Sequence, residues 1–245
     1  MRLAALSDVH GNLPALEAVI ADFRAQGCEA VVNLGDILSG PLWPAETADL
    51  LMREDWPTIA GNHERQLLTF ARERMGESDA FAAARLGERR RRWLAALPLT
   101  LAYSEDIFLC HGTPADDLEH FLETVEPDGL RKASEAEIAA RAGNRRETLI
   151  LCGHSHLPGV VKLADGRTVA NPGSVGLQAF RDDHPHPYRV ENGDPLARYA
   201  IVETGAVTLR QIPYDHHAAA AKARREGRED WAEALLTGRV DRAPG

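Results

Sequence analysis

The strongest chemical signal in the sequence is a set of short polar segments that combine histidine with aspartate or asparagine. They read SDVHGN at 7–12, GD at 35–36, GNHE at 61–64, HGTP at 111–114 and GHSH at 153–156, and they hold five of the ten histidines. Each segment alone is weak evidence, because a single histidine beside a turn is more often structural than a ligand. The ordered set is better explained by a shared metal site, because these residue types bind divalent cations.

The side chains in these segments form a donor set of imidazoles, carboxylates and one amide oxygen. The candidate ligands are Asp8, His10, Asp36, Asn62, His111, His154 and His156. This mixture favours manganese, iron, zinc or cobalt over magnesium or calcium, and the absence of thiolates from the set argues against a structural zinc site. A carboxylate such as Asp36 can bridge two ions. A water shared by both ions would be deprotonated near neutral pH and could attack the phosphorus of a phosphate ester.

Each polar segment follows an apolar run that is too short for a helix and is bounded by turn residues. The runs lie at 3–6, 30–34, 58–60, 107–110 and 149–152, and we interpret them as buried strands. Between the first two, residues 13–25 have helical apolar spacing, with Pro14 in the first turn and Gly27 just past the end. The start of the chain is therefore a βαβ unit of an α/β fold. Ligands of open α/β sheets bind at the carboxyl ends of the strands, where all the polar segments lie.

The rest of the chain supplies helices and a second group of strands. Residues 65–97 are rich in Ala, Arg and Leu and are predicted to form two helices broken near Gly76, as a small helical cap or insertion. Further helices are expected at 134–141 and 218–236, and strands of a second sheet at 160–163, 167–170, 199–203 and 207–211. The stretch 180–198 is polar and Pro-rich and is interpreted as a long loop. We expect one domain over 1–245.

Composition limits the partners of the protein. The net charge of −9 does not favour general nucleic-acid binding, and the arginines at 89–92 are interpreted as a solvated helix face. The three cysteines do not form a disulfide framework, and no apolar window approaches the length of a membrane span. No signal-peptide pattern opens the chain. We therefore expect a cytoplasmic protein with a small phosphate-ester substrate, and we make no prediction of its oligomeric state.

The polar segments also resemble the motifs of a known family. DVHGN, GD followed by Gly40 and Pro41, GNHE, HG and GHSH are similar, in this order, to the motifs of the calcineurin-like metallophosphoesterases. The NPGSVG segment at 171–176 resembles the small bacterial and archaeal phosphodiesterase branch of that family. The resemblance implies a four-layer α/β/β/α sandwich with a metal pair at the strand ends. The cofactor we predict is two divalent ions, manganese first, with iron, zinc, cobalt or nickel as alternatives.

The resemblance also implies a role for each matching residue. One ion would be held by Asp8, His10 and His156, and the other by Asn62, His111 and His154, with Asp36 as the bridge. His63 would not be a ligand. It would be the general acid that protonates the leaving oxygen, a role that suits an imidazole because it titrates near neutral pH.

Two departures from the family pattern narrow the prediction. The protein serine/threonine phosphatases and the diadenosine tetraphosphatases carry GDxxDRG, with an Asp that orients the catalytic His and an Arg on the phosphate. This chain has GDILSGP, with Ser39 and Gly40 in those places, so both subfamilies are disfavoured and the group that orients His63 is unidentified. GNHE also replaces the commoner GNHD, and Glu64 could either orient His63 or start a helix.

Weaker candidates for substrate binding are Ser174, His184 and His186. Ser174 could donate to a phosphate from a Gly-rich turn or could simply stabilise that turn, and the two histidines lie in the predicted loop at 180–198. The function we predict is hydrolysis of a small phosphodiester, with a nucleotide among the candidates. A phosphomonoesterase is the first alternative, and a non-catalytic scaffold of the same fold, like the retromer subunit that resembles this family, is the second.

Overall fold

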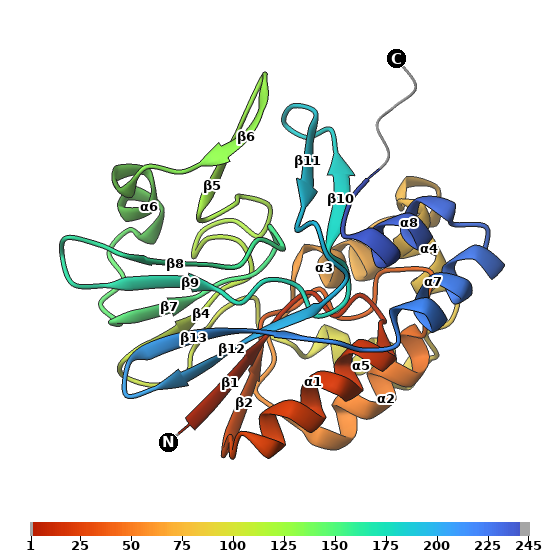
Figure 1. Ribbon diagram of the computed structural model, residues 1–245, viewed down its shortest axis with the longest axis horizontal. Coiled ribbons are helices and arrows are strands. Elements are labelled where there is room, and N and C mark those ends of the chain that lie inside the picture. Colours follow the sequence, from red (N-terminus) through yellow and green to blue (C-terminus); the bar gives the residue numbers. More distant parts are fainter. Residues whose placement is uncertain (1, 241–245) are drawn as a thin grey trace.

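The computed structural model describes residues 2–240 and contains two β-sheets packed face to face between layers of helices (Figure 1). In the first sheet the strand order is β13-β12-β1-β2, and in the second it is β3-β4-β7-β9-β8. The strands of the first sheet are β1 (Arg2–Leu6), β2 (Ala30–Asn33), β12 (Ala197–Glu203) and β13 (Ala206–Ile212). Those of the second are β3 (Leu101–Ala102), β4 (Ile107–Leu109), β7 (Leu149–Leu151), β8 (Gly159–Lys162) and β9 (Thr168–Asn171).

The alternation of side chains along β1 produces the layers. Leu3 and Ala5 point into the core between the two sheets, whereas Ala4 and Leu6 point to the other face and pack against helix α1 (Leu13–Ala25). Both faces of the strand are therefore buried, which is why it is a continuous apolar run. The predicted α/β/β/α sandwich is confirmed.

The outer face of the second sheet is covered in the same way. Phe108, Ile150 and Val169 pack against Ile138 and Ala142 of helix α6 (Glu135–Ala142). Ser134 caps the start of this helix: its side chain accepts a hydrogen bond from the Glu137 amide, while the Glu137 carboxylate accepts one from the Ser134 amide. This reciprocal capping fixes the start of the helix that forms the fourth layer.

The helical segments are more divided than the sequence predicted. The remaining helices are α2 (Pro44–Glu54), α3 (Asn62–Thr69), α4 (Glu77–Ala83), α5 (Glu88–Ala95), α7 (His216–Arg225) and α8 (Glu229–Thr237), with a 3-10 turn η1 (Arg72–Arg74). The predicted break near Gly76 is present, but a second break at Gly87 separates α4 from α5. The predicted tail helix is likewise two helices, divided at Gly227, whose φ of +79° strongly favours glycine.

The prediction that four strands form a second sheet is wrong. The hairpin of β8 and β9 joins β7 in one sheet, whereas the hairpin of β12 and β13 joins β1 in the other. The turn residues of a hairpin determine only its internal pairing. The sheet that a hairpin extends depends on contacts with strands distant in sequence, such as Ala5 with Ala200.

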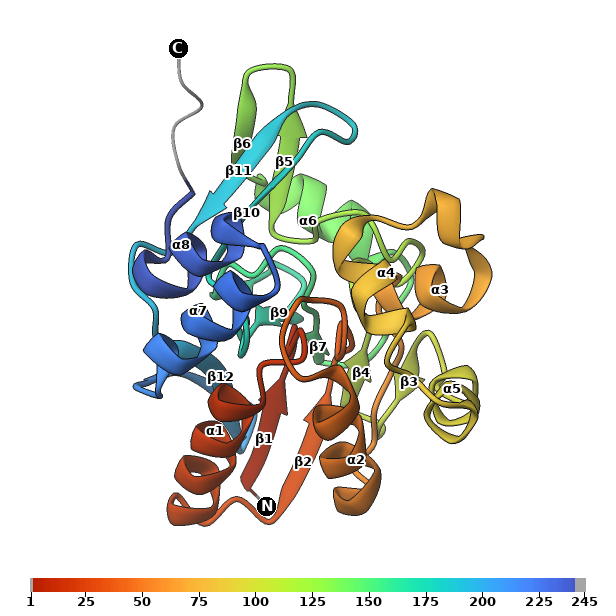
Figure 2. The same cartoon turned by 90° about the vertical axis from the view of Figure 1, so that its right-hand side faces the viewer.

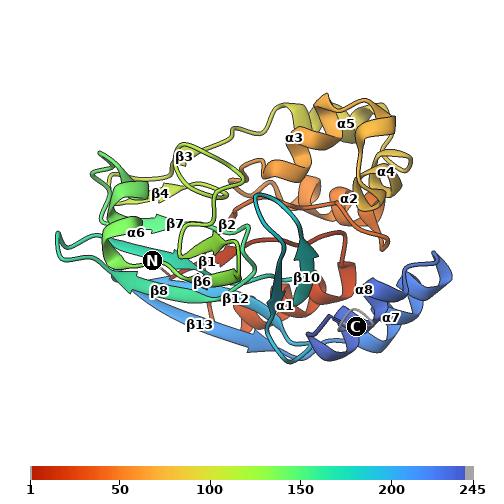
Figure 3. The same cartoon turned by 90° about the horizontal axis from the view of Figure 1, so that it is seen from above.

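The predicted loop at 180–198 contains a hairpin of its own. Strands β10 (Ala179–Asp182) and β11 (Tyr188–Glu191) pair antiparallel, and so do β5 (Glu123–Glu126) and β6 (Gly129–Lys132). Figures 1 and 2 show both hairpins projecting from the same edge of the sandwich. Seen from above, in Figure 3, the β10–β11 hairpin stands between helices α3, α4 and α5 on one side and the pair α7 and α8 on the other. Between residues 2 and 240, no helix has the length and apolar character needed to cross a membrane.

Candidate metal centre

The predicted ligands converge at one edge of the sandwich. They follow β1, β2, β4 and β7 in the chain, except for Asn62, which is the first residue of α3. Two groups of three residues each bring ligand atoms within 4.8 Å of one another; they are Asp8, His10 and His156, and Asp36, His111 and His154. Both groups combine residues from the two sheets, so the sandwich itself assembles the site.

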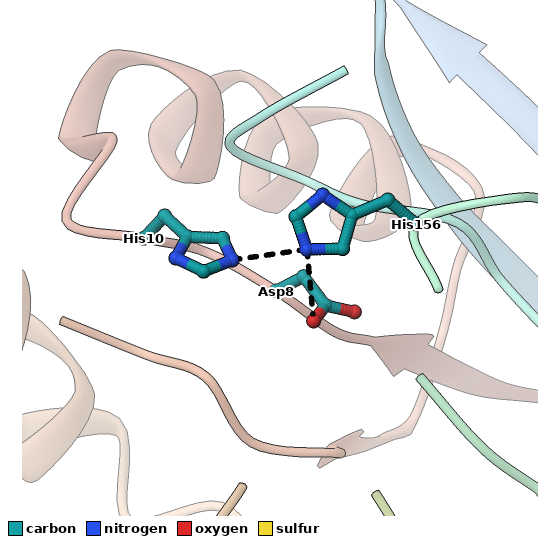
Figure 4. A group of neighbouring side chains, drawn as sticks. All are labelled: Asp8, His10 and His156. Carbon is teal, nitrogen blue, oxygen red and sulfur yellow. Dashed lines mark hydrogen bonds and ion pairs between the residues drawn. The ribbon is translucent and has the colours of Figure 1, made fainter. Parts of the chain in front are cut away.

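In the first group the ring nitrogens of two histidines face each other (Figure 4). His10 Nδ1 lies 2.8 Å from the Ser39 carbonyl and His156 Nδ1 lies 2.7 Å from the Leu177 carbonyl. A carbonyl can only accept, so both Nδ1 atoms carry hydrogen, and in this tautomer the lone pair of each ring lies on Nε2. These Nε2 atoms are 3.0 Å apart, and that of His156 is 3.3 Å from Asp8 Oδ1, a buried atom for which the described residues provide no hydrogen-bond donor. Such a cluster of acceptors is what a cation requires.

The second group repeats this arrangement around His111. Its Nδ1 donates to the Leu34 carbonyl at 2.7 Å, while Nε2 lies 3.1 Å from Asp36 Oδ2 and 3.2 Å from Asn62 Oδ1. Burial alone would lower the pKa of His111, but the Asp36 carboxylate raises it to about 10. Without metal a proton therefore sits between these acceptors, where a divalent cation would replace it.

His154 uses the opposite ring nitrogen. Its Nε2 donates to the Leu118 carbonyl at 2.9 Å, which leaves Nδ1 as the ligand atom. Burial and the nearby His111 lower the pKa of His154 to about 4, and burial together with His156 lowers that of His10 to about 3. Both rings are therefore neutral at physiological pH, as metal ligands must be.

The backbone at the ligands is unusual. Five of the seven non-glycine residues with positive φ in the described chain are candidate ligands, with φ between 51° and 66°; they are Asp8, His10, Asp36, His154 and His156. Non-glycine residues rarely adopt this region, although Asp and His tolerate it better than most. Such conformations cluster where function requires a side chain in a particular direction. Here the left-handed residues turn the chain as it leaves each strand.

His63 has a partner that the sequence did not identify. Its Nδ1 lies 2.8 Å from Oδ1 of Asp79, a buried residue of α4, and its Nε2 lies 4.0 Å from Asp36 Oδ2. The His63 amide also donates to Asp36 Oδ1 at 3.0 Å. Burial would lower the pKa of His63, but Asp36 and Asp79 together raise it to about 9. The ring is thus held as a proton donor with Nε2 directed toward the metal ligands.

The Glu64 carboxylate is hydrogen-bonded to backbone amides and not to the His63 ring. Its Oε2 accepts from the amides of Asp36 at 2.8 Å and Gly61 at 2.9 Å, and its Oε1 accepts from the amide of Ile37 at 2.8 Å. The bond to Gly61 is the helix-start interaction that was one of the two interpretations of GNHE. The other two bonds fix the loop that carries Asp36, a role that sequence reasoning missed.

A cavity of about 810 Å³ opens over the metal centre. Its floor includes His10, Asp36, Asn62, His63, His154 and His156. One wall comes from α3 and α4 with Gln66 and Ser78, and another from the β10–β11 hairpin with Phe180 and Tyr188. Helix α8 adds Trp231. None of these wall residues belongs to a motif, so their role could not be predicted from the sequence.

Trp231 also explains the departure at Gly40. A Cβ atom on Gly40 would lie 2.6 Å from the Trp231 ring and 2.7 Å from the His10 carbonyl oxygen, and the φ of this residue is +150°. The Trp231 indole of helix α8 therefore fills the space beside position 40. Proteins with the GDxxDRG motif carry an arginine at this position. Only glycine fits between that ring and the ligand loop.

The weaker substrate-binding candidates lie in different places. Ser174 is buried behind the site, where its hydroxyl donates to the Asp8 carbonyl at 2.8 Å and accepts from the Leu177 amide at 2.9 Å. It therefore stabilises the turn that carries a ligand. His184 lines the cavity from the hairpin turn, whereas His186 is not among the lining residues.

The four-layer sandwich with paired ligand groups at its strand ends is the architecture of a metallophosphoesterase. A family model for the calcineurin-like phosphoesterase superfamily domain matches residues 1–191, and the chain therefore belongs to this family of phosphoester hydrolases. The resemblance found in the sequence is confirmed.

Several proteins are similar to this chain along almost its whole length. The uncharacterized protein MJ0912 of Methanocaldococcus jannaschii is 24% identical over 97% of this chain and 98% of its own. The crystal structure of a metallophosphoesterase from Sphaerobacter thermophilus is 26% identical, with a TM-score of 0.77 over 97% of this chain and 100% of that one. The fold is also that of the hypothetical protein PH1004 from Pyrococcus horikoshii, at 18% identity and a TM-score of 0.75 over 97% and 98% of the two chains.

Proposed function

We propose that this protein hydrolyses a small phosphodiester with two divalent cations, manganese first among them. One cation would bind Asp8, His10 and His156 and the other Asn62, His111 and His154, with Asp36 between them. The observation that carries the proposal is the arrangement of acceptors: four imidazoles each donate one N–H to a backbone carbonyl and direct the other nitrogen at acceptor atoms. The donor set fits divalent transition metals.

Bound cations would lower the pKa of a water molecule and neutralise the phosphoryl oxygens. The chain's own contribution is the proton on the leaving group. Water loses a proton to solvent and adds its oxygen to phosphorus, the bond from phosphorus to one ester oxygen breaks, and His63 Nε2 gives its proton to that oxygen. His63 then regains a proton from solvent. The products are a phosphomonoester and an alcohol. Asp79 holds the ring for this transfer by accepting from Nδ1 at 2.8 Å.

The cavity favours a diester over a monoester. Its walls rise on two sides of the metal centre, beside His63 with Gln66 and Ser78, and beside His156 with Phe180. A monoester has one alcohol to accommodate, whereas a diester has two. Walls on both sides therefore suit a phosphorus atom that carries two ester groups.

Hydrolysis assays with bis(4-nitrophenyl) phosphate and 4-nitrophenyl phosphate in the presence of Mn²⁺ test the proposal. We expect the diester to be the better substrate, and the reverse preference would select the phosphomonoesterase. His63→Ala should retain metal and, for a diester with an alkyl leaving group, lose turnover by about 10²–10⁴-fold, the usual contribution of a general acid. Exposed His217, changed to Ala, is the matched control.

Asp36→Ala tests the bridge, because loss of the shared carboxylate should remove both ions. Metal content measured after dialysis reports this directly, and retained stoichiometric metal would contradict the bridging role. If no phosphate ester is cleaved and His63→Ala changes nothing, the non-catalytic scaffold is the better description.

A further inference from the structure

We infer, on the basis of the proposed diesterase activity, that the alcohol retained on phosphorus after cleavage is a nucleoside whose base packs against the β10–β11 hairpin. The relevant surface is the inner face of this hairpin. The register pairs Phe180 with Val190 and Asp182 with Tyr188, so these four side chains share one face. Phe180, Asp182 and Tyr188 line the cavity over the metal centre.

The aromatic part of this face begins at a metal ligand. The Phe180 ring packs edge-on against His156, with centroids 4.7 Å apart, and lies 6.1 Å from the Tyr188 ring. The Tyr188 hydroxyl lies 3.0 Å from His120 Nε2, and His120 packs at 4.9 Å against His154. Phe180 therefore contacts a candidate ligand directly and Tyr188 is held beside another through His120, so little conformational freedom remains to be lost when a ligand binds.

The position of His63 indicates which of the two ester groups, the leaving or the retained one, lies against this face of the hairpin. The general acid must reach the leaving oxygen, so the leaving alcohol lies on the His63 side of the site, beside Gln66 and Ser78. His63 packs 5.5 Å from His10, whereas Phe180 packs against His156. The hairpin thus lies on the side of the metal centre away from His63. The retained ester group would lie on that side.

The side chains on this face of the hairpin favour a nucleobase over an aliphatic chain as the group that packs against it. Aromatic rings stack on the flat faces of nucleobases, a gain that a flexible chain does not share. Asp182 on the same face adds a carboxylate that can accept from amino or hydroxyl groups. A volume of about 810 Å³ lies in the range of sites for drug-sized ligands, well above the need of a small alkyl phosphate.

Substrates that share one leaving group isolate the retained alcohol. Thymidine 5′-(4-nitrophenyl phosphate), methyl 4-nitrophenyl phosphate and hexyl 4-nitrophenyl phosphate all release 4-nitrophenolate and differ only in the group that stays. We expect kcat/KM to be at least tenfold higher for the thymidine ester than for the methyl ester, mainly through KM. Titration calorimetry of the Mn²⁺-loaded protein should show the same order for the products, thymidine 5′-monophosphate over methyl phosphate.

Two substitutions at Phe180 connect the preference to the hairpin. Phe180→Leu keeps apolar packing on His156 without a flat ring, and Phe180→Ala removes both. Each should reduce the thymidine-to-methyl ratio of kcat/KM by at least fivefold, and the ratio corrects for any loss of metal. Phe70→Ala is the matched control, because this half-buried phenylalanine at the end of α3 does not line the cavity.

The outcomes separate this inference from the function on which it rests. A wild-type ratio near one, or a preference for the hexyl ester, would overturn the nucleoside assignment and leave the diesterase intact. An unchanged ratio in both Phe180 variants would move the base away from the hairpin. Failure to cleave any of the three esters or bis(4-nitrophenyl) phosphate would instead remove the proposed function.

Discussion

At the scale of single residues, His63 is oriented by a carboxylate that belongs to no motif. The GDxxDRG pattern carries an orienting Asp at a fixed spacing, and this chain has Ser39 and Gly40 there. Asp79 of α4 takes the contact instead, 16 residues beyond His63. The packing of α3 against α4 creates this proximity, and no sequence spacing encodes it.

Asp79→Asn is expected to act through the leaving group. Asparagine has the same shape but lacks the charge that holds the imidazolium. Proton delivery from His63 should therefore weaken, and the loss should be greatest for leaving groups that need a proton. We expect kcat to fall about 10–100-fold for a diester with an alkyl leaving group. For a 4-nitrophenyl diester the loss should be small, because 4-nitrophenolate leaves without a proton. Metal content should not change.

The control for Asp79→Asn is Asp49→Asn, which makes the same change in helix α2, where Asp49 pairs with Arg89 and Arg90. Asp49→Asn should leave unaltered the ratio of the activity on the alkyl diester to the activity on the 4-nitrophenyl diester. An equal loss on both leaving groups in Asp79→Asn would indicate a structural role for this residue and not a positioning one.

Glu64 shows how a side chain outside the set of candidate ligands can hold one of them in place. Its carboxylate accepts from the amides of Asp36, Ile37 and Gly61, so Glu64→Gln replaces one acceptor by a donor and leaves at least one buried amide unpaired. We expect a loss of about 1–3 kcal/mol in the free energy of unfolding, measured with urea. Exposed Glu73 provides the control, and a Glu64→Gln protein as stable as wild type would show that the amides find other partners.

At the scale of elements, the sequence predicted strands and turns better than their assembly. The runs before the polar segments are strands, apart from 58–60, where Thr58 forms only an isolated bridge with Asn33. The hairpin β10–β11 was missed because polar and proline residues between Arg181 and Tyr188 are typical of a loop. Its contacts with α8, with β6 and with the candidate ligand His156 give this segment a fixed place.

Strand β5 carries a buried carboxyl whose charge should make stability depend on pH. Burial raises the pKa of Glu123 to about 7 from a reference of 4.5, although a hydrogen bond with Ser155 opposes the shift. The folded protein thus binds this proton more tightly than the unfolded chain does. The associated stability is present below pH 4.5 and is lost as the pH rises through 7, by on the order of 3 kcal/mol.

Glu123→Gln cannot ionise and should escape this loss. The free energy of unfolding of the variant, relative to wild type, should therefore rise between pH 5 and pH 8 by about 2–3 kcal/mol. Urea unfolding of both proteins at the two pH values measures the difference. Glu126→Gln, in the same strand but partly exposed, is the control. A difference that is the same at both pH values would contradict the account of Glu123.

At the largest scale, the candidate metal centre joins the two sheets. Asp8, His10 and Asp36 follow strands of the first sheet, and His111 and His156 follow strands of the second. The resemblance to a known family was enough to predict this sandwich, since its motifs mark the strand ends. What the motifs did not contain is the C-terminal helix pair, whose Trp231 closes one wall of the cavity.

Because the ligands come from both sheets, bound cations should stabilise the entire fold and not only the local loops. A ligand that binds the native state alone adds about 2.7 kcal/mol at a concentration of 100 Kd. For a chain of 245 residues this corresponds to a rise in Tm of roughly 5–10 °C. Thermal unfolding with EDTA and with Mn²⁺, followed by circular dichroism and tryptophan fluorescence, measures the shift, and both probes should move together. Asp36→Ala should abolish it and His217→Ala should keep it, whereas a full shift in Asp36→Ala would place the bound ions elsewhere on the protein.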